Sequence, residues 1–297
     1  DHVAFGSKYA GTDNIPGIID GIIENVIVAD PSDPDGIKET LEMDGDIAAV
    51  ILEPTGASSG QIPLGREFVK MLREVTKAQG IVLIFDEVVT GFRVSAGGAQ
   101  AAFGLLPDLT ALAKILAGGL PGGAVCGRRD IMQLLDFEAA EFHGFQKIPH
   151  QGTFNANPLS AATGVEMLAR VAETEVSEQA NEQGRKLMAA CNKAFATSDL
   201  TWAAYGNGSS VYIFTNPDRL DIDPENFDAL AYPMPVMERA SNHAAKDLFR
   251  LAMLVNGIDF NSKPGAIVSS VHTDEDIAAT ADAVTASIAM LREEGHV

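Results

Sequence analysis

A strand–helix–strand pattern in the first third of the sequence is the feature that most constrains the fold. Residues 47–52 form a short continuous apolar run, and residues 81–85 form a second one. Between them, residues 65–79 place apolar side chains at helical spacing, and Gly80 supplies a C-terminal helix cap. Because strands joined in this order have a right-handed crossover, the pattern predicts a parallel sheet whose strands are covered on both faces.

Both predicted strands end in an acidic residue. Glu53 follows the first strand and Asp86 follows the second. In parallel sheets of this kind, ligands bind beyond the carboxyl ends of the strands. The two acids therefore predict a site at this edge, although Glu87, directly after Asp86, shows that an acid there need not be functional.

Lys114 lies in a stretch with few other charges, Asp-Leu-Thr-Ala-Leu-Ala-Lys-Ile-Leu-Ala-Gly-Gly, residues 108–119. We expect its amine to be held partly out of water, which disfavours the ammonium form and makes a lysine nucleophilic toward carbonyls. Pyridoxal phosphate (PLP) chemistry requires a lysine for a Schiff base and an acid for the pyridinium nitrogen. Lys114 and Asp86 are candidates for these two roles.

The rest of the sequence predicts a second unit of different character. A strand at 122–126 and a long helix at 158–174, opened by Pro158, complete the first part. After it we expect these elements in order: a helix at 177–196, strands at 200–205 and 209–215, a polar loop at 216–235, a helix ending at Asn256, strands at 258–260 and 266–271, and a last helix. Thr273 and Asp276 form a capping box for that helix. The prediction is an α/β large domain of mostly parallel sheet, residues 1–172, and a smaller α+β domain, residues 173–297.

Composition excludes several classes of function. The formal net charge of −20 argues against nucleic acid, whose binding proteins carry basic stripes. We identify no apolar run of transmembrane length and no signal peptide, so no membrane association is expected. Cys126 and Cys191 have no metal-ligand spacing and are too few for a disulfide framework. We expect a cytoplasmic protein of small-molecule chemistry without a metal.

Several sequence motifs occur together along the chain. They are Phe-Asp-Glu-Val-Val-Thr-Gly-Phe-Arg (85–93), Pro-Asp-Leu-Thr-Ala-Leu-Ala-Lys (107–114), Gly-Gly-Leu-Pro-Gly-Gly-Ala (118–124), Gln-Gly-Thr-Phe-Asn-Ala-Asn-Pro-Leu (151–159), Ala-Val-Ile-Leu-Glu-Pro (49–54) and Val-His-Thr-Asp-Glu-Asp-Ile (271–277). Together they resemble the class III aminotransferases, which have the PLP-dependent transferase fold (fold type I), and most closely the glutamate-1-semialdehyde aminomutase branch. Their order and spacing are far more specific than any one of them alone. The resemblance covers nearly the whole chain.

The resemblance implies roles for the residues around Lys114. Lys114 would form the Schiff base with PLP and move the substrate's α-proton. Asp86 would keep the pyridine nitrogen protonated, so that the ring accepts electrons. Val88 would pack against one face of the ring. Glu53 lies near the cofactor in relatives, and Arg93 has a structural role in this interpretation.

The same resemblance implies a homodimer with shared sites. Thr153, after Gly152, resembles the threonine that donates to the cofactor phosphate, commonly across the dimer interface. A two-fold axis lets one loop complete both sites at once. The apolar, glycine-rich residues 116–125 are candidates for the interface.

Two departures from the family pattern bear on function. Relatives have a phosphate-binding Gly-Ser/Thr turn and a ring-stacking aromatic before the position where Asp1 aligns, so we expect a piece of a longer protein or a reduced homologue. The aminomutase carries a glutamate where residues 261–269 have no acid. We therefore favour amino-group transfer between an amine or amino acid and a keto acid or aldehyde. Aminomutase-type isomerisation and a catalytically silent fragment are the alternatives, and Lys263 is a candidate cation for a substrate carboxylate.

Overall fold

A four-stranded sheet forms the first half of the protein. The computed structural model describes residues 21, 24–55, 63–260 and 265–297. The strands β1 (Ala49–Leu52), β2 (Val82–Glu87), β3 (Leu109–Ala113) and β4 (Gly123–Gly127) lie in that order across the sheet. The first three are mutually parallel and β4 is antiparallel to β3. The predicted parallel pairing of the first two strands is therefore confirmed.

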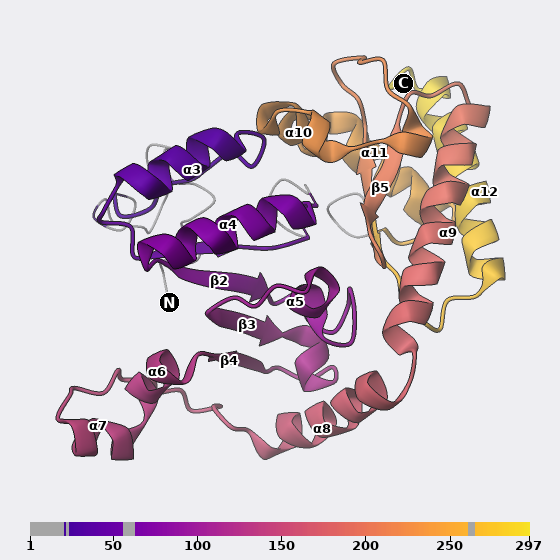
Figure 1. Cartoon of the computed structure of the whole chain (residues 1–297). Helices are drawn as coiled ribbons and strands as arrows, with labels where there is room; N and C mark the ends of the chain where they lie inside the picture. The colour runs from indigo at the N-terminus through magenta and orange to yellow at the C-terminus, as the bar shows by residue number, and fades with distance from the viewer. Residues whose placement is uncertain (1–20, 22–23, 56–62, 261–264) are drawn as a thin grey trace.

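The helix α4 (Arg66–Gln79) is the predicted crossover between β1 and β2. Gly80 adopts the left-handed conformation (φ 72°) and caps it, as expected for a residue without a Cβ. The helix buries its apolar stripe, Val69, Leu72 and Val75, against Leu83 and Phe85 of β2. The helix α3 (Pro34–Met43) lies beside α4 on the same side of the sheet (Figure 1).

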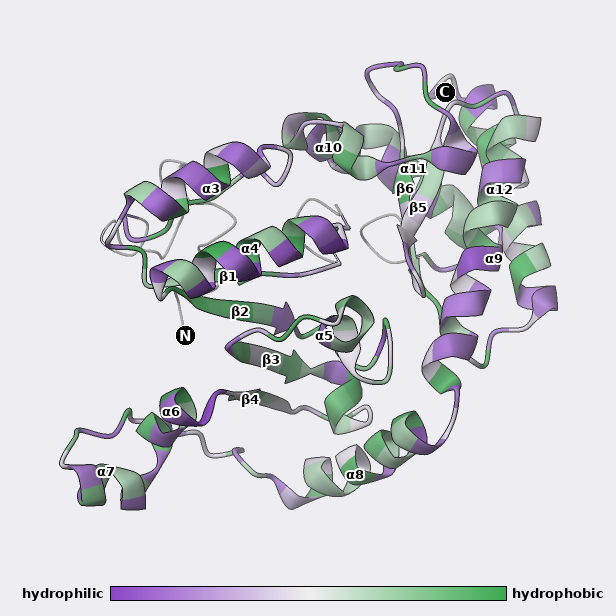
Figure 2. Cartoon of the chain, viewed as in Figure 1, coloured by the Kyte–Doolittle hydropathy of each residue, from purple (hydrophilic) through white to green (hydrophobic). Residues whose placement is uncertain are grey.

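The opposite face of this sheet is open in the described chain, and the expectation that its strands are covered on both faces is wrong here. Ile51 in β1 is 52% exposed and Val125 in β4 is 54% exposed. β1 is an edge strand, and its burial alternates because only Val50 and Leu52 pack against the core under α4. Most of the strand surface is nevertheless hydrophobic, and β2 becomes hydrophilic only at its tip (Figure 2).

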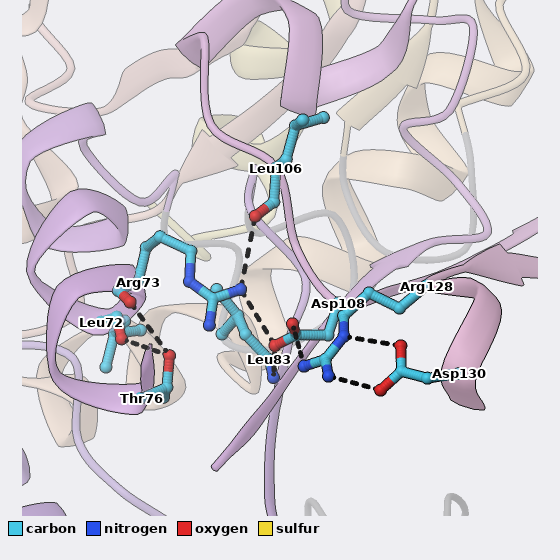
Figure 3. A network of polar contacts seen from close by, with 8 residues as sticks. All are labelled: Leu72, Arg73, Thr76, Leu83, Leu106, Asp108, Arg128 and Asp130. Carbon is cyan, nitrogen blue, oxygen red and sulfur yellow. Dashed lines mark hydrogen bonds and ion pairs between the residues drawn. The ribbon is translucent and has the colours of Figure 1, made fainter. Parts of the chain in front are cut away.

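A buried carboxylate fixes the start of β3. Asp108 is 5% exposed; one carboxylate oxygen accepts from Leu83 N (2.8 Å) and from Arg73 Nη1 (2.9 Å), and the other accepts from Arg128 Nη1 (3.0 Å) (Figure 3). Burial alone raises the pKa of Asp108, but the hydrogen bonds from Leu83, Arg128 and Arg73 outweigh it, so the pKa is lowered. These contacts hold β2, β3 and β4 together at the end of the sheet opposite Lys114.

Short elements lie within and after the first sheet. α5 (Gly98–Phe103) joins β2 to β3, and the 3-10 turn η2 (Lys114–Ala117) joins β3 to β4. After β4, the chain forms α6 (Arg129–Met132), η3 (Gln133–Leu135) and α7 (Phe137–His143). The predicted long helix is α8 (Pro158–Glu173), opened by Pro158 and capped by the side chain of Asn157. It packs against η2, where Thr163 Oγ1 donates to Ala117 O (2.8 Å).

An antiparallel three-stranded sheet organises the second unit. Its strands β5 (Ala203–Asn207), β6 (Ser210–Phe214) and β7 (Gly265–Ile267) lie in that order. The helices are α9 (Val176–Thr197), α10 (Met234–Ser241), α11 (Ala244–Val255) and α12 (Asp274–Glu293), with the short 3-10 turns η4 (Pro224–Asn226) and η5 (Ala229–Ala231). α9, α11 and α12 cover one face around Phe195, Trp202 and Phe249.

Three details of the second unit differ from expectation, and one is confirmed. The strand expected at 266–271 is only the three residues of β7, Gly265–Ile267. Residues 258–260 are no strand: Ile258 N closes the end of α11 by donating to Met253 O (2.9 Å), and Phe260 is buried in the core, so their apolar character serves packing. The helix expected to run up to Asn256 is broken at 242–243 into α10 and α11. The predicted Thr273–Asp276 capping box opens α12.

The two sheets stand beside one another, joined by α8 and α9 (Figure 1). The boundary at residues 172 and 173 falls at the end of α8 and remains a prediction. Within the described ranges, no helix is both long and apolar enough to cross a membrane.

Candidate active site

Asp86 and Lys114 lie at the same edge of the first sheet. Asp86 in β2 is in register with Ala111 of the neighbouring parallel strand β3, and Lys114 directly follows that strand. The strand β3 was not predicted from the sequence, although the apolar run 109–113 after Pro107-Asp108 is the signal that could have revealed it. Parallel pairing thus brings together two side chains that are 28 residues apart.

Lys114 has an unusual backbone and an accessible amine. Its φ is 51°, in the left-handed region that non-glycine residues seldom occupy and that clusters at functional sites. Its Nζ lies 3.5 Å from Val88 O, the outer limit of a hydrogen bond. The side chain is exposed, so the expected partial burial is wrong for the described chain. The strand ends at Ala113 and the next turn packs on α8, so the apolar neighbours do not enclose the amine.

Asp86 and Glu87 point to opposite faces because side chains alternate along a strand. Asp86 is half-buried on the open face, and its Oδ1 accepts from Val88 N (3.1 Å), which orients the carboxylate. Glu87 is fully buried on the α4 face and caps α5, accepting from Ala99 N (2.6 Å) and from Gln100 N (3.3 Å). Burial raises the pKa of Glu87 despite these hydrogen bonds. Glu87 therefore has a structural role, whereas the neighbouring Asp86 is available to contact a ligand.

Glu53 lies at the neighbouring strand end. Its Oε1 accepts from both the backbone N (3.0 Å) and the hydroxyl (2.9 Å) of Thr55. Its charge also acts on Tyr212 of β6, across the junction between the two sheets. Tyr212 was not among the sequence-predicted residues, because only the tertiary fold brings β6 to this edge.

Arg93 joins the loop after β2 to the second sheet. Its Nη1 donates to Ser209 Oγ and to Val268 O, both at 3.1 Å. These contacts match the structural role expected for it. Residues 261–264, which include the candidate cation Lys263, lie outside the described residues.

Gly152 and Thr153 are not brought to Lys114 within one chain. Both are exposed in the turn before α8, where Gly152 O accepts from Asn155 N (3.0 Å). In the described structure, Thr153 makes no hydrogen bond to Lys114, Asp86 or Val88. Their contact with a cofactor phosphate stays a prediction.

The available groups fit a ring that carries both a carbonyl and a basic nitrogen. The accessible amine of Lys114 and the oriented carboxylate of Asp86 lie at the ends of adjacent strands. The β-branched Val88 lies between these two residues along the chain. These are the groups that PLP requires.

Comparison with known proteins identifies the family. Residues 35–208 match the family model "Aminotransferase class-III". The glutamate-1-semialdehyde 2,1-aminomutase of Caldicellulosiruptor saccharolyticus is 34% identical over 267 residues, which are 89% of this chain and 58% of that protein. The chain thus spans about three fifths of the length of the curated relatives it matches.

Solved structures agree in fold. An omega-transaminase from Sphaerobacter thermophilus superposes with a TM-score of 0.77 at 29% identity, over 94% of this chain and 60% of that one. A structure described as a transaminase with PLP bound gives a TM-score of 0.79 at 29% identity, over 97% of this chain and 64% of that one. The predicted PLP-dependent transferase fold is confirmed, and the chain belongs to the class III aminotransferase family.

Proposed function

We propose that this chain carries the catalytic lysine of a PLP-dependent aminotransferase that moves an amino group between an amine or amino acid and a keto acid or aldehyde. The observation that carries the proposal is the placement of Lys114 and Asp86 at the ends of adjacent parallel strands. Family membership and the similarity to a transaminase with PLP bound support it.

Each residue has a defined task in this proposal. When bound, PLP supplies an electron sink for the carbanion that forms on the substrate. Lys114 Nζ holds the cofactor covalently and moves the proton at the substrate's reacting carbon. The Asp86 carboxylate, oriented by Val88 N, keeps the pyridine nitrogen protonated. Val88 would pack against the ring, and Glu53 borders the site at the end of β1.

Lys114→Ala tests the proposal. We expect the wild-type chain to develop a near-visible absorbance band with PLP and to retain the cofactor covalently after borohydride reduction, whereas Lys114→Ala does neither. Lys70→Ala removes another exposed lysine, on α4, and is the matched control. A borohydride adduct on any lysine other than Lys114 would contradict the assignment.

An aminomutase-type isomerisation is the second candidate, since the curated relatives with about one-third identity are named glutamate-1-semialdehyde 2,1-aminomutase. An isomerase moves the amino group within one substrate and needs no acceptor. Conversion of the semialdehyde without an added keto acid favours this candidate. Turnover that depends on a keto acid favours the aminotransferase, and a chain that binds PLP without either reaction favours a catalytically silent fragment.

We also infer that the active unit is a two-fold dimer in which Gly152 and Thr153 of one chain contact the phosphate held by the other. Both residues are exposed, and among the described residues Thr153 forms no hydrogen bond with Lys114, which supports this arrangement. Large apolar side chains of α7, of α8 and of the segment between them are strongly exposed and suit an interface: Phe137 78%, Phe142 84%, Phe154 82%, Leu159 66% and Val165 71%. All of β4 is exposed as well, and its residues 123–125 fall within the predicted interface 116–125.

A further inference from the structure

The turn after β2, residues 88–94, contacts both candidate catalytic groups. Val88 N donates to Asp86 Oδ1 (3.1 Å), and Val88 O lies 3.5 Å from Lys114 Nζ. The backbone of one residue therefore meets the carboxylate and the amine that the proposed reaction needs. A shift of this turn would change how the two groups are placed relative to each other.

The first sheet fixes the start of the turn. Gly91 N donates to Glu87 O (2.9 Å) at the end of β2. A Cβ at Gly91 would lie 2.6 Å from Leu112 Cδ2 and 2.7 Å from Glu87 O. The turn therefore lies directly against β2 and β3 at this point.

Two side chains of α9 contact the end of the turn. Ser177 Oγ donates to Phe92 O (2.7 Å), and Asn181 Nδ2 donates to Val94 O (3.0 Å). Ser177 and Asn181 are four residues apart and therefore lie on the same face of the helix. Phe92 has φ 62°, and a non-glycine residue keeps such a conformation only where the surrounding contacts hold it.

Asn181 is itself fixed by the second sheet. It is 4% exposed, and its Oδ1 accepts from Ser209 N (2.9 Å) in the turn between β5 and β6. Gly208 in that turn has φ 58°, and a Cβ there would lie 2.3 Å from Asn181 Oδ1. Because the oxygen and the nitrogen of its amide both pair with backbone groups, Asn181 links the second sheet to the turn after β2.

We propose that Asn181, assisted by Ser177, is a positioning residue that fixes the turn after β2. Through this turn it keeps Val88 at the Asp86 carboxylate and beside the Lys114 amine, without itself touching cofactor or substrate. Groups that act together in a reaction need such support from the residues behind them. The inference rests on the proposed function and adds the second unit to what holds its site.

Asn181→Ala tests this role, and Asn192→Ala is the matched control. Asn192 is the other asparagine of α9; it is also buried, and it pairs with the backbone of Ala204 and Pro224 inside the second unit. The two variants lose comparable hydrogen bonds, so they should lose comparable stability.

Hydrogen exchange of the full chain without PLP, followed by mass spectrometry, distinguishes the two variants. In Asn181→Ala, exchange at residues 88–94 should be about tenfold faster than in the wild type, the factor that corresponds to the loss of one buried hydrogen bond. In Asn192→Ala, the faster exchange should appear at residues 203–207 instead.

PLP binding gives a readout that a loss of stability alone does not change. The dissociation constant for PLP, measured from the near-visible band, should rise about tenfold in Asn181→Ala and stay at the wild-type value in Asn192→Ala. Ser177→Ala removes only a half-buried hydroxyl and should change both readouts in the same direction, so it decides the test if Asn181→Ala does not fold.

Equal exchange at residues 88–94 in the two asparagine variants would overturn the inference. Faster exchange there with unchanged PLP binding would overturn it as well, because Asn181 would then fix the turn without positioning the site. A wild type that forms no PLP band would contradict the proposed function, whereas the exchange comparison would still decide whether Asn181 fixes the turn.

Discussion

At the scale of single residues, neighbouring acids have different tasks because of the face on which each lies. Asp86 faces the open side of the sheet, whereas Glu87 is buried as the cap of α5. The two cannot exchange roles, since side chains one residue apart on a strand point to opposite faces of the sheet. Only Asp86 is placed for chemistry.

Asp86→Asn should lower amino-group transfer by about 100-fold, the scale on which one oriented electrostatic group contributes to a reaction. The neutral amide cannot stabilise a protonated pyridine nitrogen. Steady-state kinetics with saturating PLP would measure the loss, and the exposed Asp247→Asn on α11 is the control. Activity within a few-fold of the wild type would remove Asp86 from the proposed mechanism.

Asp108 makes stability depend on pH in the acid range. Its pKa is lowered in the folded state, so its contribution is present above the unfolded value, about 3.9, and is lost as the pH falls through the lower folded value. Asp108→Asn should reduce the free energy of unfolding at pH 7 by about 3 kcal/mol, because it leaves Arg73 with a weaker partner at a buried site.

Urea unfolding of the wild type and of Asp108→Asn between pH 3 and pH 7 measures this effect. The quantity to compare is the difference between their free energies of unfolding at each pH. The difference should shrink as the pH approaches 3. A difference that stays constant with pH would show that the charge of Asp108 is not what stabilises this end of the sheet.

At the scale of elements, the turn η2 and the helix α8 approach closely through glycine. Gly118 has φ 62°, and a Cβ there would lie 2.3 Å from Thr163 O in α8. Gly118→Ala should therefore move α8 away from the turn that begins with Lys114. We expect a loss of about 1–3 kcal/mol in the free energy of unfolding together with weaker PLP retention.

Gly119→Ala is the matched control for this contact. Gly119 also has positive φ (95°), but its added Cβ would meet nothing within 4 Å. It should show the cost of backbone strain alone. Equal effects of the two substitutions on stability and PLP retention would mean that the close approach of α8 does not position Lys114.

At the scale of the whole molecule, the shared-site dimer predicts complementation between two defective chains. Lys114→Ala and Thr153→Ala impair different residues of one site. In a mixed dimer, one site carries both changes and the other carries neither, because each site takes its lysine and its threonine from different chains. Refolding the two variants together should restore activity above that of either alone, as measured by turnover and by solution mass. Absence of recovery in a confirmed mixed dimer would place Thr153 in its own chain's site.

The sequence by itself determined the local elements and the family. The apolar runs and helical spacing of residues 47–85, the cap at Gly80 and the Thr273–Asp276 box are local signals, and each was found where expected. The combination of motifs around Asp86 and Lys114 was specific enough to indicate the class III aminotransferases, which the comparisons confirmed.

Only the tertiary structure decided which residues meet. β3 was missed although Pro107-Asp108 precedes it, because an apolar run this short does not by itself distinguish a strand from a buried helix segment. The exposure of β1 depends on its edge position rather than on its composition. The break between α10 and α11 and the packing of residues 258–260 also depend on neighbours. Arg93 contacts Ser209 and Val268 across more than 100 residues. The sequence could not predict these contacts, because hydrophobic periodicity specifies how an element is buried but not which distant polar groups will face it.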